Sequence, residues 1–86
     1  MTDALPRIFF DSNEGTLQNG YWLNLPTSRR DLEKLGEQLR EGLHVLLHMP
    51  TEFEVEAVLT FDREFNLWVG MPVASTLRYL DGSDEA

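Results

Sequence analysis

The chain contains no cysteine, and this absence excludes several kinds of structure and chemistry. Without a thiol there can be no disulfide framework, no thiolate metal site and no cysteine nucleophile. Packing and hydrogen bonding alone must hold the folded state together. At 86 residues the chain has room for one hydrophobic core, so we expect a single domain over residues 1–86.

Basic residues are also scarce, with seven Lys and Arg against fifteen Asp and Glu and a net charge of −8. Four of the seven lie in residues 28–41, where four acidic side chains balance them, so the negative excess belongs to the rest of the chain. Binding to nucleic acids and to anionic membranes depends largely on Lys and Arg. The charge therefore argues against both partners.

Long apolar runs are missing, and the N-terminus has no basic start followed by an apolar stretch. We therefore expect a soluble, cytoplasmic protein of bacterial type. The small and acidic residues 81–86 are expected to form a disordered tail.

Motifs of known catalytic chemistry are absent as well. No serine lies in a Gly-x-Ser-x-Gly setting, and the chain has no glycine-rich phosphate loop. We predict no catalytic residue, no cofactor and no enzymatic activity.

Hydrophobic periodicity is the strongest signal that is present. Strict alternation of apolar and polar residues predicts strands over residues 43–49 and 53–62, and a third follows over 66–73. Two shorter aromatic segments, 7–11 and 21–25, flank a stretch of turn-forming residues, and we expect them to form a hairpin.

Leucines at helical spacing predict an amphipathic helix over residues 28–41. Ser28 and Asp31 have the spacing of a capping box at its start. Arg29 is expected to pair with Glu33 one turn later. Gly36 lies within the apolar stripe, which suggests a close approach between the helix backbone and the sheet.

The predicted fold is therefore α+β, a ββαβββ antiparallel sheet with one amphipathic helix packed on it. A small five-stranded β-barrel, with the helix between strands 2 and 3, is the alternative. One helix cannot cover both faces of such a sheet. The second face would still carry an apolar set among charged neighbours: Trp22, Leu46, Val58 and Trp68 among His44, His48, Glu54 and Glu56.

His44 and His48 would be metal ligands on a helix, but on a strand they lie about 13 Å apart, too far to share one ion. We predict no metal site. Glu52, Glu54 and Glu56 form a row along the next strand. Nothing marks one of them as buried, so a solvated strand face is expected.

These patterns favour a protein-interaction or regulatory module that acts through the second sheet face. Trp22, Leu46 and Trp68 would anchor a partner protein, or a second copy of the chain in a homodimer. Glu54 and Glu56 would attract a basic partner. The alternative is a ligand-binding or catalytic domain with a site between sheet and helix, built from His44, His48 or the glutamates.

Overall fold

Two strands with alternating apolar residues form the centre of the sheet. β4 (His44–Met49) and β5 (Phe53–Asp62) pair in antiparallel register, and β6 (Leu67–Pro72) pairs with the other edge of β5. Inward side chains at the middle of these strands, among them Val45, Leu47 and Val55, are fully buried. These three strands match the segments predicted from periodicity.

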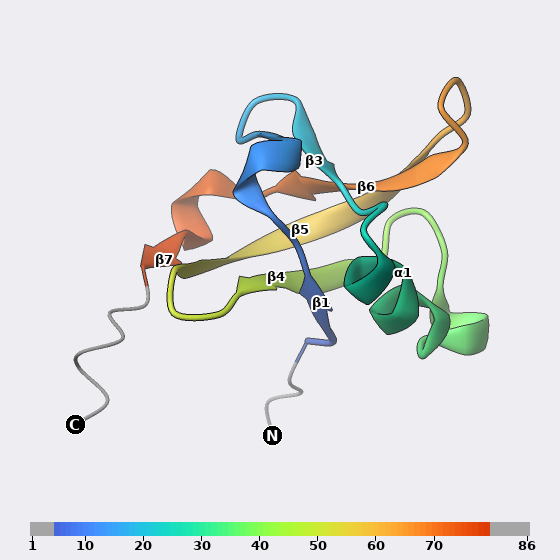
Figure 1. Ribbon diagram of the computed structural model, residues 1–86, viewed down its shortest axis with the longest axis horizontal. Helices are drawn as coiled ribbons and strands as arrows, with labels where there is room; N and C mark the ends of the chain where they lie inside the picture. The colour runs from blue at the N-terminus through green and yellow to red at the C-terminus, as the bar shows by residue number, and fades with distance from the viewer. Residues whose placement is uncertain (1–4, 80–86) are drawn as a thin grey trace.

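The computed structural model describes residues 5–79, in which one helix packs on a mostly antiparallel seven-stranded sheet (Figure 1). The predicted α+β class is therefore confirmed. The tail expected over residues 81–86 lies outside the described residues. The remaining strands are short: β1 (Arg7–Phe9), β2 (Gly15–Thr16), β3 (Gly20–Trp22) and β7 (Arg78–Tyr79).

The sheet order is β1-β4-β5-β6-β3-β2, with β7 pairing to β5. The expected hairpin of the two N-terminal strands is wrong, because β1 pairs with β4 in parallel and β3 pairs with β6. The turn formers between them instead build a short 3₁₀ helix, Ser12–Glu14, and a separate β2–β3 hairpin. Gly15 is required there, since an added Cβ would overlap the Gly20 backbone.

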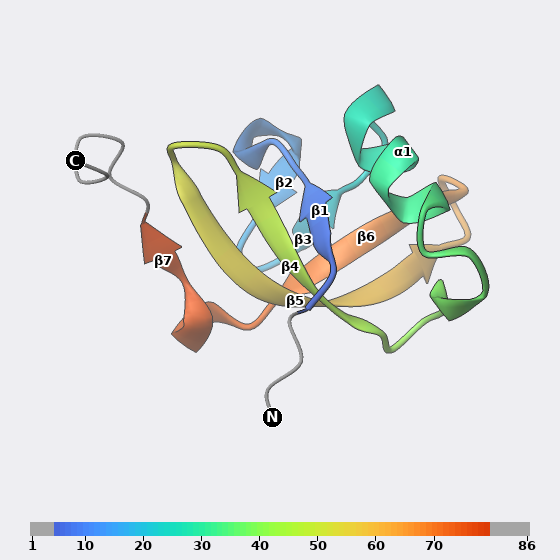
Figure 2. The same ribbon diagram turned by 90° about the horizontal axis from the view of Figure 1, so that it is seen from below.

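The sheet curls strongly around its inner face without closing (Figure 2). β1 and β3 are well separated in the strand order, yet Phe10, directly after β1, packs edge-on against Tyr21 of β3, with ring centroids 4.9 Å apart. The barrel alternative is therefore wrong. The two ends of the sheet meet through side chains of the core and not through backbone pairing.

The helix α1 (Pro26–Glu33) is shorter than predicted and begins earlier, with Pro26 in its first turn. Gly36 adopts φ +57° and opens a 3₁₀ turn, Gly36–Gln38. No atom lies within 4 Å of a Cβ added at Gly36, so the expected close approach to the sheet is wrong. This glycine serves the backbone conformation after the helix. Among residues 5–79 no helix is long and apolar enough to cross a membrane.

Ser28 and Asp31 do not form a capping box, because the helix begins at Leu25 and Pro26. Both side chains bind the backbone of Phe9 instead. The Ser28 hydroxyl donates to the Phe9 carbonyl at 2.6 Å, and the Phe9 N–H donates to the Asp31 carboxylate at 2.9 Å. The helix thus supplies hydrogen-bond partners to the backbone of Phe9 at the free edge of β1. Leu32, on the same face of the helix, packs in the core.

Candidate functional site

The strand register assigns each predicted site residue to a face of the sheet. We call the face that carries Val45, Val55 and Leu59 the inner face, and the opposite one the outer face. Residues directly opposite each other on neighbouring strands point to the same side. The outer face accordingly carries six of the seven predicted partner-binding residues: Trp22, His44, Leu46, His48, Glu54 and Glu56.

Trp68 is the exception, since it lies opposite Phe61 on the inner face, with ring centroids 5.2 Å apart. Its expected position on the second face is therefore wrong. Gly70 also points inward, where an added Cβ would lie only 3.0 Å from Leu47. The apolar residues Leu67, Val69 and Met71 suggested that this side of β6 faces the core. The register with β5 places all three on the outer face instead.

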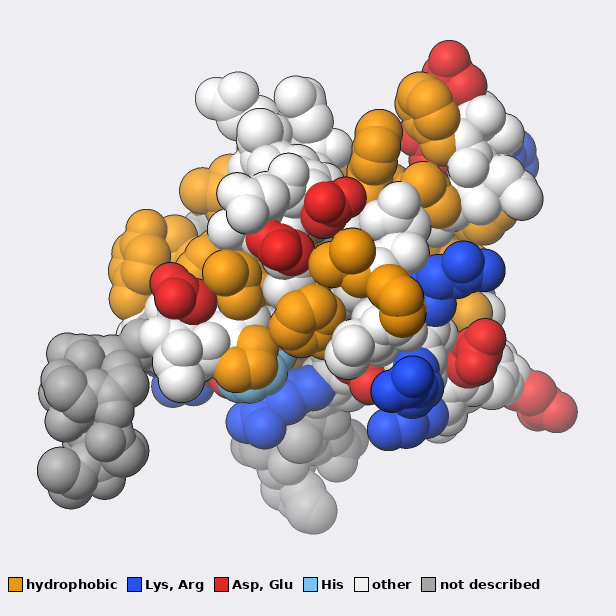
Figure 3. All heavy atoms as spheres, in the orientation of Figure 1, with side chains coloured by type: hydrophobic (Ala, Val, Ile, Leu, Met, Phe, Trp, Pro, Cys, Tyr) orange, Lys and Arg blue, Asp and Glu red, His pale blue; other side chains and the backbone are white. Residues whose placement is uncertain are grey.

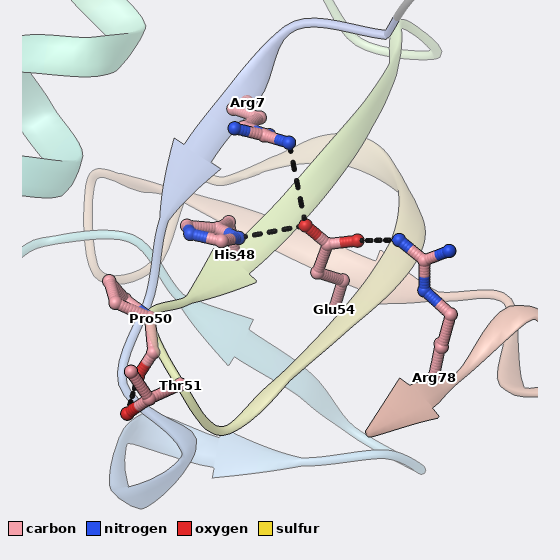
Figure 4. A network of polar contacts seen from close by, with 6 residues as sticks. All are labelled: Arg7, His48, Pro50, Thr51, Glu54 and Arg78. Carbon is pink, nitrogen blue, oxygen red and sulfur yellow. Dashed lines mark hydrogen bonds and ion pairs between the residues drawn. The ribbon is translucent and has the colours of Figure 1, made fainter. Parts of the chain in front are cut away.

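Glu54 is the centre of a charged cluster on the outer face (Figure 4). Its side chain is only 3% exposed, so the expectation that no glutamate of the row is buried is wrong. Arg78 donates to one carboxylate oxygen at 2.6 Å, and His48 contacts the other at 2.9 Å through Nδ1. Arg7 lies 3.8 Å from that second oxygen.

Burial acts to raise the pKa of Glu54, but the hydrogen bonds and charges of Arg78 and His48 outweigh it. The pKa of this carboxyl therefore lies below its usual value, and Glu54 is an anion at neutral pH. Because two guanidinium groups surround that anion, Glu54 does not present negative charge to a partner. It holds β7, β5, β4 and β1 together.

The second histidine has its own carboxylate. His44 lies 2.8 Å from Glu56 through Nδ1, on the same face but in a separate pair. Within residues 5–79 each imidazole contacts one carboxylate, and no three His, Asp or Glu side chains of this range come together to hold a metal ion. His44 and His48 are thus each paired with a glutamate of the neighbouring strand β5.

Exposed aromatic side chains gather at another part of the outer face. Trp22 is 37% exposed and packs against Phe65, which is 53% exposed, with ring centroids 5.2 Å apart. Met71 is 36% exposed and lies on the same face. Trp22 is directly opposite Val69, and Met71 follows Val69 by two residues on β6, so both point to the same side of the sheet. Hydrophobic side chains collect over β6 and the β5–β6 turn in Figure 3. We call Trp22, Phe65 and Met71 the Trp22 corner.

A hollow of about 360 Å³ adjoins the Trp22 corner. Trp22 lines one side, and the β2–β3 hairpin with the preceding turn lines the rest. Glu14 supplies its only ionisable side chain, and no ion pair among the described residues involves Glu14. Trp22 and Glu14 therefore line the same small hollow.

A second hollow, about 430 Å³, lies between α1 and the β5–β6 turn. Trp68, Phe61 and Leu32 are part of its apolar lining. Arg29 and Glu33 line it from the helix, but the ion pair expected between them does not form, since neither takes part in an ion pair within residues 5–79. A hollow between sheet and helix is therefore present, but His44, His48, Glu54 and Glu56 do not line it.

Comparison of the chain with protein-family models, with curated proteins and with solved structures gave no match. The candidate sites consequently rest on geometry alone. Sequence reasoning found Trp22 but missed Phe65 and Glu14. The available signal was a large aromatic inside the polar turn Arg63-Glu64-Phe65-Asn66, where no strand or helix periodicity explains it.

Proposed function

We propose that this chain is a protein-interaction module that binds a basic segment of a partner protein at the Trp22 corner. The observation that carries the proposal is the pair of Trp22 and Phe65, exposed side by side next to a hollow lined by Glu14, which forms no ion pair within residues 5–79. The outer face remains the surface of interest, but its aromatic part replaces the glutamate row as the centre.

Aromatic side chains supply much of the binding energy at protein interfaces, because they bury a large area and have few rotamers to lose. Val69 lies directly opposite Trp22 on the same face and is buried, so Trp22 has an apolar neighbour on β6. Leu46, in contrast, is half-buried between Glu56 and Arg7 in the strand register. We therefore expect Trp22 and Phe65 to contribute more to binding than Leu46.

Charge favours a basic partner over an acidic one. The net charge is −8, and within the described part of the chain no Lys or Arg lines the hollow beside Trp22. An Arg or Lys side chain placed there would meet the indole through a cation–π contact and Glu14 through an ion pair. The remaining acidic residues would speed the encounter at low ionic strength.

The test selects random peptides displayed on phage against the purified protein and measures the affinity of enriched sequences by calorimetry. We expect enriched peptides to contain Arg or Lys. Trp22→Ala should weaken them about thirtyfold or more, because loss of a central aromatic anchor costs at least about 2 kcal/mol. Glu14→Gln should weaken the basic peptides and leave neutral ones unchanged.

Tyr79→Ala is the matched control. Tyr79 is 75% exposed, but it pairs with Phe53 at the far end of β5, about 30 Å from the β5–β6 turn by strand length. Selected peptides that bind wild type, Trp22→Ala and Phe65→Ala equally well would contradict the proposal. A homodimer by light scattering that Trp22→Ala converts to monomer would assign the corner to self-association instead.

A further inference from the structure

The larger hollow, between α1 and the β5–β6 turn, has the features of a small-molecule site. We infer that it binds a free α-amino acid with a large apolar side chain. The hollow shares Phe65 with the Trp22 corner, but its lining includes neither Trp22 nor Glu14, so the inference does not rest on the proposed function. Its volume of about 430 Å³ lies within the range of ligand pockets, about 300 to 1,000 Å³.

Two opposite charges on the helix define the polar side of the hollow. Arg29 and Glu33 are one helical turn apart, so their Cβ atoms are about 5 to 6 Å from each other. Both line the hollow, and neither forms an ion pair within the described part of the chain. The two charged groups are therefore available to a ligand.

The ligand needs both charges to satisfy this pair. A simple anion at Arg29 would face the Glu33 carboxylate, and a simple cation at Glu33 would face the Arg29 guanidinium. A free α-amino acid carries a carboxylate and an ammonium on one carbon atom. It can give the carboxylate to Arg29 and the ammonium to Glu33, each in a charge-assisted hydrogen bond.

The opposite side of the hollow is apolar. Trp68 and Phe61 pack edge to face there, and Leu32 of α1 adds an aliphatic contact. Asn24 and Asn66 contribute neutral amides, which can bond a carboxylate or an ammonium. An aromatic or long aliphatic side chain can lie on Trp68 while the charged end of the amino acid reaches the helix. Glycine and the charged amino acids lack this apolar contact.

The experiment titrates the isotope-labelled full chain with L-phenylalanine and follows amide and indole resonances by NMR. Small ligands gain about 0.3 kcal/mol per heavy atom in an open site, which corresponds to a Kd on the order of 1 mM for this probe. We expect saturable shifts at the Trp68 indole and at the Asn24 and Asn66 side-chain amides. The Trp22 indole does not line the hollow and touches it only through Phe65, so its shift should be clearly smaller than that of the Trp68 indole.

Two fragments of the same probe test the charge argument. 3-Phenylpropionate lacks the ammonium group and phenethylamine lacks the carboxylate, so each should bind roughly tenfold more weakly than L-phenylalanine. Arg29→Gln and Glu33→Gln should each weaken L-phenylalanine by a similar factor. Arg30→Gln is the control, because Arg30 is exposed on the same helix and does not line the hollow.

Absence of saturable shifts with L-phenylalanine up to its solubility limit would overturn the inference. So would a 3-phenylpropionate affinity equal to that of L-phenylalanine, since Glu33 would then have no part in recognition. Equal weakening by Arg29→Gln and Arg30→Gln would show a general charge effect and would also overturn it. Peptide binding at the Trp22 corner is tested separately by Trp22→Ala and Glu14→Gln, because neither residue lines this hollow.

Discussion

Among single residues, Glu54 combines deep burial with full charge. Its carboxylate receives Arg78 and His48 at hydrogen-bond distance, while the two arginine side chains around it remain largely in water. Because the guanidinium groups stay hydrated, the cluster avoids most of the cost of burying both members of an ion pair. Glu54 therefore stabilises the junction of four strands.

Replacement of Glu54 by Gln should reduce the free energy of unfolding by about 1 to 3 kcal/mol at pH 7, since hydrogen bonds to a charged group are lost. The effect depends on pH. The pKa of Glu54 is lower in the folded state, so its stabilisation is complete above its unfolded pKa, about 4.3, and disappears as pH falls through the folded value. The difference between wild type and Glu54→Gln should thus shrink below about pH 4.5.

Chemical denaturation from pH 3 to 7 measures this difference. Glu52→Gln is the matched control, because Glu52 is an exposed acid in the turn before the same strand. A constant gap between wild type and Glu54→Gln at all pH values would contradict the role of the Glu54 charge.

The burial of Glu54 could not be predicted from its own strand. Glu54 and Glu56 alternate identically in the sequence, and only the later pairing of β7 brings Arg78 beside one of them. That contact spans 24 residues. Local periodicity contains no information about it.

At the scale of secondary-structure elements, α1 and β1 form a unit. Ser28 and Asp31, one turn apart on the helix, bind the carbonyl and the N–H of Phe9 as a neighbouring strand would. β1 is an edge strand, and unpaired edges tend to associate with other chains. The helix thus protects this edge through two side chains.

Ser28→Ala should lower the free energy of unfolding by about 1 to 2 kcal/mol, because the partly buried Phe9 carbonyl loses its hydrogen bond to the buried Ser28 hydroxyl. Asp31→Ala should increase the hydrogen-exchange rate of the Phe9 amide. Thr27→Ala is the control, since Thr27 is exposed and the helix is not capped by a side chain. Destabilisation by Thr27→Ala as large as that by Ser28→Ala would support a capping role instead.

The helix itself was predictable, but its boundaries were not. The spacing of Ser28 and Asp31 fits a capping box and a pair of strand-edge ligands equally well. Pro26 decides between them, since proline favours the first helical turn and so places Ser28 inside the helix. Gly36 at positive φ then ends the regular segment near Glu33.

At the scale of the whole molecule, the strands β4, β5 and β6 followed directly from alternation, whereas the pairing of β1 did not. A parallel partner more than 30 residues away leaves no local pattern, and the turn between β1 and β3 suggested a hairpin. The exposed corner was half predicted. Trp22 lies in a recognisable strand, but Phe65 comes near it only because the β5–β6 turn folds back beside β3.

The curl of the sheet depends on the aromatic contacts that join its two ends. Phe10 is fully buried and touches both Tyr21 and Phe53 edge to face. Phe10→Ala should cost about 3 to 5 kcal/mol. A domain of this size has about 4 to 13 kcal/mol of total stability, so this variant loses a large part of it and should melt well below the wild type.

Thermal unfolding followed by near-ultraviolet circular dichroism measures the effect. Phe65→Ala serves as the control, because it removes an equally large but exposed ring and should cost less than about 1 kcal/mol. Equal stability of the two variants would contradict the role of Phe10. The open sheet would then keep its curvature through backbone pairing alone. The hollows beside β3 and α1 would not depend on the contact between Phe10 and Tyr21.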